Sequence, residues 1–451
     1  MAGKFEIYQD AGGQFRFRLR AGNGQILAEG EPYATKDGAR RGCEAVQRAA
    51  AGAEIGEIGG SGAKGGSGAA PHPTHDGGGA PASRPGVDHV VVLVQENHTT
   101  DNYFSGLAPW GANVATGWPA QPNPPAHDQP HDRHAYYKWL TSGTATRASF
   151  DTLSVLPYYS YLALTGAFLE NHCSGFGTNS TPNHLMIVGG QSPTMRNPPR
   201  TNPPVWDLPS LPGTAQDAGV SWRCYCPYGG YPVSFYAQLK GSANLTTPDQ
   251  FGADVGNGQM AALSMIWHAS PDDEHPPADV TLGQNAVRAA VDAVVAAGKW
   301  DTTVFMLTWD DWGGWDDHVA TPNVEHTSDG IQCAYGPRVP LLVFGGPVAA
   351  NIDSRWNSHV AITKTALQLL GLPALGVPRV DQDPGLADLV SDHPVTPAPP
   401  PNQPAPPLPA APQPTPAPRP LPPPPTLQSI PTPECILRDG TTLPAPNDVP
   451  V

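Results

Sequence analysis

Two adjacent carboxylates, Asp310 and Asp311, stand directly after an apolar run of strand length. Residues 302–309 are β-branched or apolar, as in a buried strand, and a pair of glycines shortly afterwards lets the backbone turn away. In open α/β sheets the chemistry lies outside the carboxyl ends of the strands. Carboxylates at that place, with His318 a few residues later, suit a hard or borderline divalent cation. The alternative is a solvated acidic loop after an ordinary core strand.

A second strand is also expected to end in oxygen ligands. Residues 87–94 form a nearly continuous apolar run, which is typical of a strand covered on both faces. Glu96 and Asn97 follow almost at once. An ordinary turn would explain either residue alone. Two separate strands that both end in metal-type ligands are much rarer by chance, so the pair favours a metal site.

A hydroxyl that could act as a nucleophile stands at the start of a predicted helix. Ser180 or Thr181 can cap this helix, with Pro182 at its first position. A hydroxyl placed there beside a metal can attack phosphorus while the backbone amides receive the phosphate oxygens. On its own this motif is usually a simple helix cap. The metal-type clusters elsewhere in the chain are what favour Ser180 as a nucleophile.

Six short motifs follow one another along the chain, at residues 96–104, 180–184, 274–277, 309–318, 326–328 and 336–343. In this order they resemble the motifs of a family of bacterial phosphoesterases, which holds the non-zinc phospholipases C and an acid phosphatase. That family lies within the alkaline-phosphatase-like superfamily. The resemblance covers roughly residues 86 to 375.

The resemblance implies a fold and a set of site residues. The implied fold is a three-layer α/β sandwich with a central, mostly parallel sheet. One divalent metal ion is implied, with Ca, Mg, Mn and Zn all open as its identity. Its ligands would be Glu96, Asn97, Ser180, Asp310 and Asp311, with Ser180 also the nucleophile. The histidines near the phosphate or the leaving group would be His275, His318 and His359. The chain departs from the family at residues 98–101, where an arginine is usual, and this affects how that loop is braced.

Hydrolysis of a phosphate ester explains why these residue types belong together. The ester is anionic and resists attack, so a cation must offset the charge on its oxygens and activate the hydroxyl. A histidine with a pKa near neutrality can protonate the departing alkoxide. We therefore expect metal-dependent hydrolysis of the phospholipase C type through a phospho-serine, on a phosphate ester such as a phospholipid head group. The alternatives are a phosphomonoesterase of the acid-phosphatase type and a catalytically degenerate scaffold protein.

Composition predicts four parts along the chain. Glycine (49) and proline (56) are so abundant that long low-complexity segments must exist. Residues 53–86 are predicted to be a Gly/Ala/Ser-rich linker, and residues 391–451 a Pro-rich disordered tail. The catalytic domain is expected over residues 87–390. The net charge of −15 argues against a nucleic-acid partner.

Residues 1–52 are expected to form a small α+β unit of their own. Residues 4–10 and 14–20 alternate at strand period, and a helix is expected to begin after Thr35. This part resembles the small YegP-type bacterial domain. The chain has no apolar run of membrane-spanning length, and its first residues lack a signal-peptide core. The prediction is therefore a cytoplasmic protein without a transmembrane segment, with export by an unrecognised route as the alternative; the oligomeric state stays open.

Three further histidines, His127, His131 and His134, lie in a loop rich in proline and aspartate. They could line the substrate pocket, although a surface loop is the simpler explanation. The apolar patterns also predict helices over residues 286–297 and 359–370, and a core strand around Trp222 and Tyr225.

Overall fold

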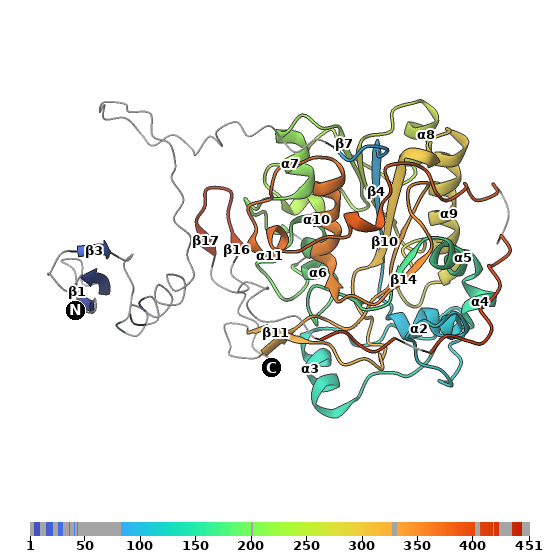
Figure 1. Ribbon diagram of the computed structural model, residues 1–451, viewed down its shortest axis with the longest axis horizontal. Coiled ribbons are helices and arrows are strands. Elements are labelled where there is room, and N and C mark those ends of the chain that lie inside the picture. Colours follow the sequence, from blue (N-terminus) through green and yellow to red (C-terminus); the bar gives the residue numbers. More distant parts are fainter. Residues whose placement is uncertain are drawn as a thin grey trace. The chain divides into compact units, whose positions relative to one another are not determined.

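The structure is a computed structural model that describes residues 4–9, 15–20, 26–29, 36, 40, 43, 83–199, 202–326, 332–401, 406–417, 419–423 and 435–443. The chain divides into two compact units, residues 1–76 and 77–451 (Figure 1). The boundaries predicted from composition at residues 52, 86 and 390 stay predictions.

The described part of the first unit is a three-stranded sheet in the order β1-β2-β3, formed by β1 (Lys4–Gln9), β2 (Phe15–Arg20) and β3 (Ile26–Glu29). The strands β1 and β2, which the alternating pattern predicted, pair antiparallel. Glu6 of β1 accepts hydrogen bonds from Arg18 and Arg20 of β2, both at 2.9 Å. The predicted helix lies mostly outside the described residues, although Lys36, Arg40 and Cys43 are helical.

The second unit is built on an eight-stranded sheet in the order β14-β5-β13-β10-β4-β9-β7-β8. Only β13 runs opposite to the other strands of this sheet. The strands are β4 (His89–Gln95), β5 (Ala167–Leu169), β7 (Trp222–Tyr225), β8 (Leu245–Thr246), β9 (Leu263–Trp267), β10 (Thr303–Trp309), β13 (Leu341–Phe344) and β14 (Asn351–Asp353). The two strands that the apolar runs predicted, β4 and β10, are central neighbours.

The sheet has a hydrophobic core on each face, because successive side chains of a strand point to opposite sides. In β4, Val90, Val92 and Val94 belong to one core, whereas Val91 and Leu93 belong to the other. This is why the strand is apolar throughout instead of alternating. The predicted three-layer α/β sandwich with a mostly parallel sheet is therefore confirmed.

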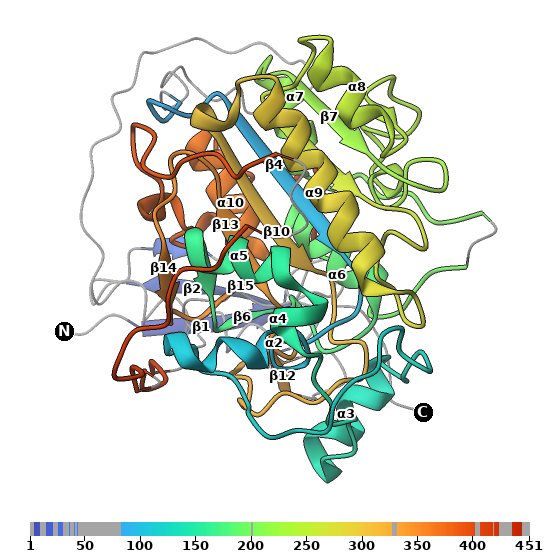
Figure 2. The ribbon, with the colours of Figure 1, turned by 90° about the vertical axis from the view of Figure 1, so that its right-hand side faces the viewer.

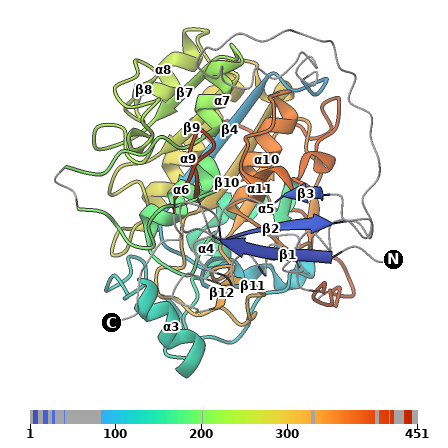
Figure 3. The same cartoon turned by 90° about the vertical axis from the view of Figure 1, so that its left-hand side faces the viewer.

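Helices cover both faces. Figure 2 faces one layer, which consists of α2 (Thr100–Phe104), α5 (Pro157–Thr165), α8 (Gln250–Gly256) and α9 (Val280–Ala296). Figure 3 faces the other layer, which consists of α6 (Ser180–Gly189), α7 (Leu211–Asp217), α10 (His359–Leu369) and α11 (Pro378–Asp381). The helices predicted at residues 286–297 and 359–370 are confirmed as α9 and α10. No described helix combines the length and the apolar composition needed to cross a membrane.

Shorter elements complete the unit. They include α3 (Arg133–Ser142), α4 (Thr152–Val155) and three strand pairs: β6 (His172–Cys173) with β15 (Asn357–Ser358), β11 (Asn323–His326) with β12 (Gln332–Ala334), and β16 (Cys435–Ile436) with β17 (Thr442–Leu443). The pair β16–β17 belongs to the Pro-rich tail.

Tryptophan indoles hold the described parts of the tail against the second unit. The N–H groups of Trp300, Trp110 and Trp356 donate to backbone carbonyls of the tail, at 2.9, 3.1 and 2.9 Å. A proline-rich segment has few N–H groups of its own, so its carbonyls are what it offers for hydrogen bonds. Farther on, Cys435 is fully buried in the core. Composition alone does not predict this attachment.

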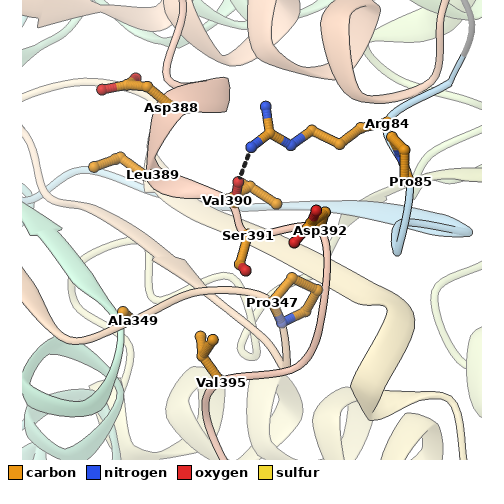
Figure 4. Close-up of a pocket in the computed structure, with 10 residues that line it drawn as sticks. All are labelled: Arg84, Pro85, Pro347, Ala349, Asp388, Leu389, Val390, Ser391, Asp392 and Val395. Atoms are coloured by element: carbon orange, nitrogen blue, oxygen red, sulfur yellow. Dashed lines mark hydrogen bonds between the residues drawn. The ribbon is translucent and has the colours of Figure 1, made fainter.

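A surface cleft of about 630 Å³ lies between the start of the unit and the start of the tail (Figure 4). Arg84 crosses it and donates to the carbonyl of Val390, and Pro347 and Ala349 line its opposite side. Arg84 precedes β4, and Pro347 follows the antiparallel β13. The cleft therefore lies at the amino ends of the parallel strands, opposite the edge where the predicted ligands gather.

Candidate active site

The predicted ligands of the two strands lie side by side because β4 and β10 pair in parallel and end in register. Gln95 is the partner of Trp309, so Glu96 and Asp310 both stand one residue beyond the same pair. The amide of Asp310 donates to the carbonyl of Gln95 at 3.0 Å, which fixes the two chain ends to each other. The edge expected from the strand pattern is thus formed by adjacent strands (Figure 1).

Asp310 divides its two oxygens between the backbone and the centre of the site. Its Oδ1 accepts from the amides of Asn97 (3.1 Å) and Asp311 (2.7 Å). Its Oδ2 is buried and has no hydrogen-bond partner among the described residues. Backbone donors therefore hold the carboxylate so that one oxygen stays available, as a metal ligand requires.

Asp311 shows the same division. Its Oδ1 accepts from the amide of Gly313 at 2.8 Å, and its Oδ2 accepts from the hydroxyl of Ser180 at 3.3 Å. Thr181, the neighbouring hydroxyl, instead bonds the hydroxyl of Tyr231 at 2.9 Å. Of the two candidate nucleophiles, only Ser180 shares a hydrogen bond with a predicted ligand.

The helix that carries Ser180 begins two residues earlier than expected, at Ser180 instead of Pro182. Asn179 is the N-cap of α6, and Ser180 is its first residue. The amide of Thr181 already donates to Oδ1 of Asn197 at 2.7 Å, and Pro182 has no N–H. Two of the backbone amides predicted to bind phosphate oxygens are therefore not available. The negative charge of the phosphate has to be offset by other groups.

The side chain of Asn97 is oriented by a histidine. Its Nδ2 lies 3.4 Å from Nε2 of His131, while its Oδ1 is buried and meets no hydrogen-bond partner in the described part of the chain. Asn97 has a φ of 71°, in the left-handed region that asparagine tolerates better than most residues. The backbone of Gly313 packs so closely that a Cβ there would lie 2.1 Å from the carbonyl oxygen of Asn97.

Burial and mutual repulsion define the electrostatics of the site. Burial raises the pKa of Asp310 well above its usual range, and the charge of Asp311 beside it adds to the effect. Burial also raises the pKa of Asp311, with Glu96 adding to it. For Glu96 burial acts in the same direction, but the hydrogen bond and charge of His184 outweigh it and lower the pKa. Three carboxylates this close are a strong attractor for a cation.

The sequence did not single out His184, which lies against these carboxylates. Its Nε2 is 3.5 Å from Oε1 of Glu96 and 3.4 Å from Oδ2 of Asp310. A signal was available, because residues four apart on a helix share a face and Ser180 is at that spacing. The spacing does not predict the partner of Nδ1, the other ring nitrogen of His184. That partner is the Nε1–H group of Trp267, at the end of β9.

His275 lies near the predicted ligands, as expected. The charge of Glu96 raises its pKa against the opposing effect of burial. Its Nδ1 lies 2.8 Å from the carbonyl of Pro276, so the proton is held there and Nε2 is left with a lone pair. His131 lies close by, with ring centroids 6.1 Å apart, and is half-buried. Of the three loop histidines, His127 and His134 are exposed, whereas His131 joins the site.

The other two predicted histidines have different surroundings. His318 bonds Oδ2 of Asp101 at 2.6 Å and belongs to a buried ion-pair network in which Arg338 binds Asp101 and Asp317. His359 is fully buried. Its Nδ1 accepts from the amide of Gly175 at 3.1 Å, and its Nε2 bonds the carbonyl of Trp309 at 3.0 Å. The charges of Glu96 and Asp310 thus act on His275, whereas the hydrogen bonds of His318 and His359 go to groups other than the ligand carboxylates.

A buried glutamate ties several segments of the site together. The carboxylate of Glu274 accepts from Tyr103 (2.7 Å), Trp309 (2.9 Å), Gln95 (3.1 Å) and Tyr159. Gln95 and Trp309 directly precede Glu96 and Asp310. Burial raises the pKa of Glu274 to about 7. At residues 98–101, His98 bonds the carbonyl of Glu274 at 3.3 Å, so this histidine braces the loop where the family has arginine.

Comparisons with known proteins identify relatives for both units of the chain. The family described as "Phosphoesterase family" matches residues 125–373, which is more than half of the chain. A second family, "Domain of unknown function (DUF1508)", matches residues 10–57. A UPF0339 protein of Treponema denticola is 52% identical over 58 residues, which are 13% of this chain and 100% of that protein. These matches confirm the predicted YegP-like unit at the N-terminus.

The second unit has more distant relatives. Phospholipase C A of Mycobacterium tuberculosis (strain H37Rv) is 25% identical over 311 residues, which are 52% of this chain and 60% of that protein. The chain thus spans about three fifths of the length of this relative. A solved structure of a protein in the alkaline phosphatase superfamily, from Vibrio parahaemolyticus, is 12% identical, covers 66% of this chain and 69% of that chain, and has a TM-score of 0.37.

Proposed function

Because the chain belongs to the Phosphoesterase family, we propose that it hydrolyses phosphate esters with Ser180 as the nucleophile and one divalent cation as the cofactor. The observation that carries the proposal is the hydrogen bond from Ser180 to Asp311, at an edge where two strands end in carboxylates. A hydroxyl, a cation site and a nearby histidine are the parts that transfer of a phosphoryl group to serine requires.

The donor set fits a hard or borderline divalent cation. Oδ1 of Asn97 and Oδ2 of Asp310 are buried without a hydrogen-bond partner among the described residues. Buried acceptors are rarely left in that state, and a bound cation would satisfy both. The residues that would hold it are Glu96, Asn97, Ser180, Asp310 and Asp311. When bound, such a cation offsets charge on the phosphoryl oxygens and increases the reactivity of the hydroxyl.

The chain's own groups account for the movement of protons. The hydroxyl of Ser180 donates a hydrogen bond to Oδ2 of Asp311. This carboxylate can therefore accept the proton that Ser180 loses when it attacks phosphorus. His275 holds one proton on Nδ1 through the carbonyl of Pro276. Its Nε2 can therefore carry a second proton and donate it to the departing alkoxide.

His359 and His318 fit supporting roles better than direct ones. Both ring nitrogens of His359 bind backbone groups, one just before the nucleophile helix and the other at Trp309, the last residue before the carboxylate pair. Burial lowers the pKa of His359 well below its usual range, so the ring is neutral. His318 and Asp101 join the loop after β10 to the loop after β4. We propose that both histidines position catalytic segments.

The substrate proposed here is a phospholipid, cleaved on the glycerol side of its phosphate, because relatives of the second unit are named phospholipases C. The competing substrate is a phosphomonoester, as in an acid phosphatase. The two differ in what leaves in the first step, a diacylglycerol or a simple alcohol. The assay therefore offers both kinds of substrate.

The test is a substrate panel with the full-length chain. It contains phosphatidylcholine vesicles, a soluble aryl phosphodiester and an aryl phosphomonoester, each assayed with Mg²⁺, Ca²⁺, Mn²⁺ or Zn²⁺ and with excess chelator. We expect hydrolysis that depends on the cation and is lost in Ser180→Ala. Cleavage of the monoester alone would favour the phosphatase. Absence of turnover with every substrate and cation would favour the degenerate scaffold.

A further inference from the structure

On the side away from the ligand carboxylates, the ring of His184 accepts a hydrogen bond from a tryptophan. The indole Nε1–H of Trp267 lies 3.2 Å from Nδ1 of His184, and both side chains are buried. An indole N–H can only donate, so Nδ1 has to accept with its lone pair. The proton of the neutral ring must then be on Nε2. Trp267 therefore fixes the tautomer of His184.

The protonated nitrogen faces the ligand carboxylates. Nε2 of His184 is 3.5 Å from Oε1 of Glu96 and 3.4 Å from Oδ2 of Asp310. Neither Nε2 of His184 nor Oδ2 of Asp310 has a hydrogen-bond partner among the described residues, so these contacts are electrostatic and leave Oδ2 available to a cation. We infer that His184 is a positioning residue that steadies these two carboxylates by directing Nε2–H toward them, and that it does not bind the cation itself. The inference rests on the metal site of the proposed function.

The competing role, a metal ligand, conflicts with Trp267. Glu96, His184 and Asp310 do form a group whose ligand atoms lie within 4.8 Å of one another. A histidine that binds a cation through Nε2 carries its proton on Nδ1 and donates it to an acceptor. Here that proton would point at another N–H group at 3.2 Å, with no acceptor between them.

A doubly protonated ring meets the same obstacle. The carboxylates Asp310 and Glu96 raise the pKa of His184, although its burial acts in the opposite direction. A second proton would again sit on Nδ1, against the indole N–H. The geometry therefore favours the neutral ring over the charged one. Aromatic packing also holds the ring plane, because Tyr231 meets it edge to face at 5.4 Å and 88°.

The position of His184 on α6 links the nucleophile to the carboxylates. Ser180 and His184 are four residues apart, one turn along the same face of the helix. Ser180 contacts Asp311, and His184 contacts Glu96 and Asp310. One rigid helix therefore sets the distance of the hydroxyl and the orientation of the ligands together.

The direct test reads the ring nitrogens of His184 by ¹⁵N NMR of the full chain labelled on histidine. The His184 signals are assigned by their loss in His184→Gln, and spectra are taken before and after addition of Mg²⁺ or Zn²⁺. We expect Nδ1 without a proton and Nε2–H retained in both states. A proton on Nδ1, or loss of the Nε2 proton on addition of the cation, would overturn the inference.

Matched variants provide a second readout, the affinity for the cation by calorimetry without substrate. His184→Gln keeps an N–H donor near the place of Nε2, whereas His184→Leu removes it. Losing a group that orients ligands typically weakens metal binding by roughly 10–100-fold, so Leu should show this loss and Gln should stay within a few-fold of wild type. Equal loss in both variants would make His184 a ligand and refute the inference. If the wild-type protein binds no cation, the proposed function is refuted. The cation-free NMR spectrum still shows which ring nitrogen of His184 carries the proton.

Discussion

The hydroxyl of Ser180 and the carboxylate of Asp311 meet across 131 residues of sequence, with Oγ 3.3 Å from Oδ2. One residue begins the helix α6, and the other follows the strand β10. Neither the sheet nor the helix layer holds a complete site alone. The contact between these two residues is where the layers bring the nucleophile and the cation ligands together.

Ser180→Ala should reduce turnover by roughly 10³-fold or more, because among the described residues it removes the only hydroxyl that shares a hydrogen bond with a predicted ligand. The fold should persist, since the change deletes one oxygen atom. Trapping with a slow substrate followed by peptide mass spectrometry should place the phosphate of the wild-type intermediate on Ser180. A phosphate mapped to another residue would contradict the mechanism.

The matched control is Thr181→Ala, at the adjacent position. The hydroxyl of Thr181 bonds Tyr231 and not a carboxylate. We expect turnover within about tenfold of wild type and a modest loss of thermal stability from one buried hydrogen bond. If both alanine variants lost turnover equally, the assignment of Ser180 would have no support.

Asp310→Asn should abolish cation binding and nearly all turnover, yet stabilise the cation-free protein near neutral pH. The reason is that Asp310 and Asp311 repel each other in a buried site, where burial already disfavours the charge of Asp310. The checks are cation binding by calorimetry and the melting temperature in chelator. Wild-type cation affinity in the variant would show that Asp310 is not a ligand.

The stability of the folded chain should fall between about pH 4.5 and pH 7 because of Glu274. Burial raises the pKa of this carboxyl to about 7 from the usual 4.5. Between these two pKa values the Glu274 carboxyl keeps its proton in the folded state but releases it in the unfolded chain, so unfolding becomes more favourable as pH rises. At lower pH the carboxyl is protonated in both states and does not affect the free energy of unfolding. The contribution is on the order of 3 kcal/mol. Denaturant titrations at several pH values should show a smaller fall in Glu274→Gln than in wild type.

Gly313→Ala should damage both stability and turnover. Gly313 has a φ of 59°, and a Cβ there would meet the backbone of Asn97, which cannot give way easily. The left-handed backbone costs about 1 kcal/mol for alanine, and the clash adds to this. The control is Gly219→Ala, which has a φ of 70° but open space around the new Cβ. Thermal melting should show a small shift for Gly219→Ala and a much larger one for Gly313→Ala; equal shifts would mean that the contact with Asn97 is unimportant.

The strand ends could be predicted because their signal is local. The apolar runs before Glu96 and Asp310 fix two buried strands, and parallel pairing places their ends at one edge. The environments of the histidines could not be predicted in this way. His184 is hydrogen-bonded to Trp267, which lies 83 residues away on a strand. His359 is hydrogen-bonded to the carbonyl of Trp309, 50 residues away. Spacing along the chain does not show which backbone group will meet a ring nitrogen.

The tail illustrates the same limit. Proline-rich composition predicts a disordered, extended tail, and among the described parts of residues 391–423 there is neither a strand nor an α-helix. The attachment depends on indole donors at Trp110, Trp300 and Trp356, which lie far away in sequence. A hydrogen bond between a scattered tryptophan and a carbonyl leaves no pattern in either segment.

The return of the tail to the nucleophile layer sets an order of events during synthesis on the ribosome. Gln191, just beyond α6, exchanges two hydrogen bonds with the backbone of Ile436, both at 2.8 Å. Translation therefore delivers α6 about 245 residues before the strand that Gln191 pairs with. Until that strand emerges, the amide of Gln191 must be satisfied by water and the apolar surface that Cys435 later covers stays open. A nascent chain halted before residue 435 should hence carry its serine on an incompletely covered helix layer, which makes that stage a point where chaperones would bind.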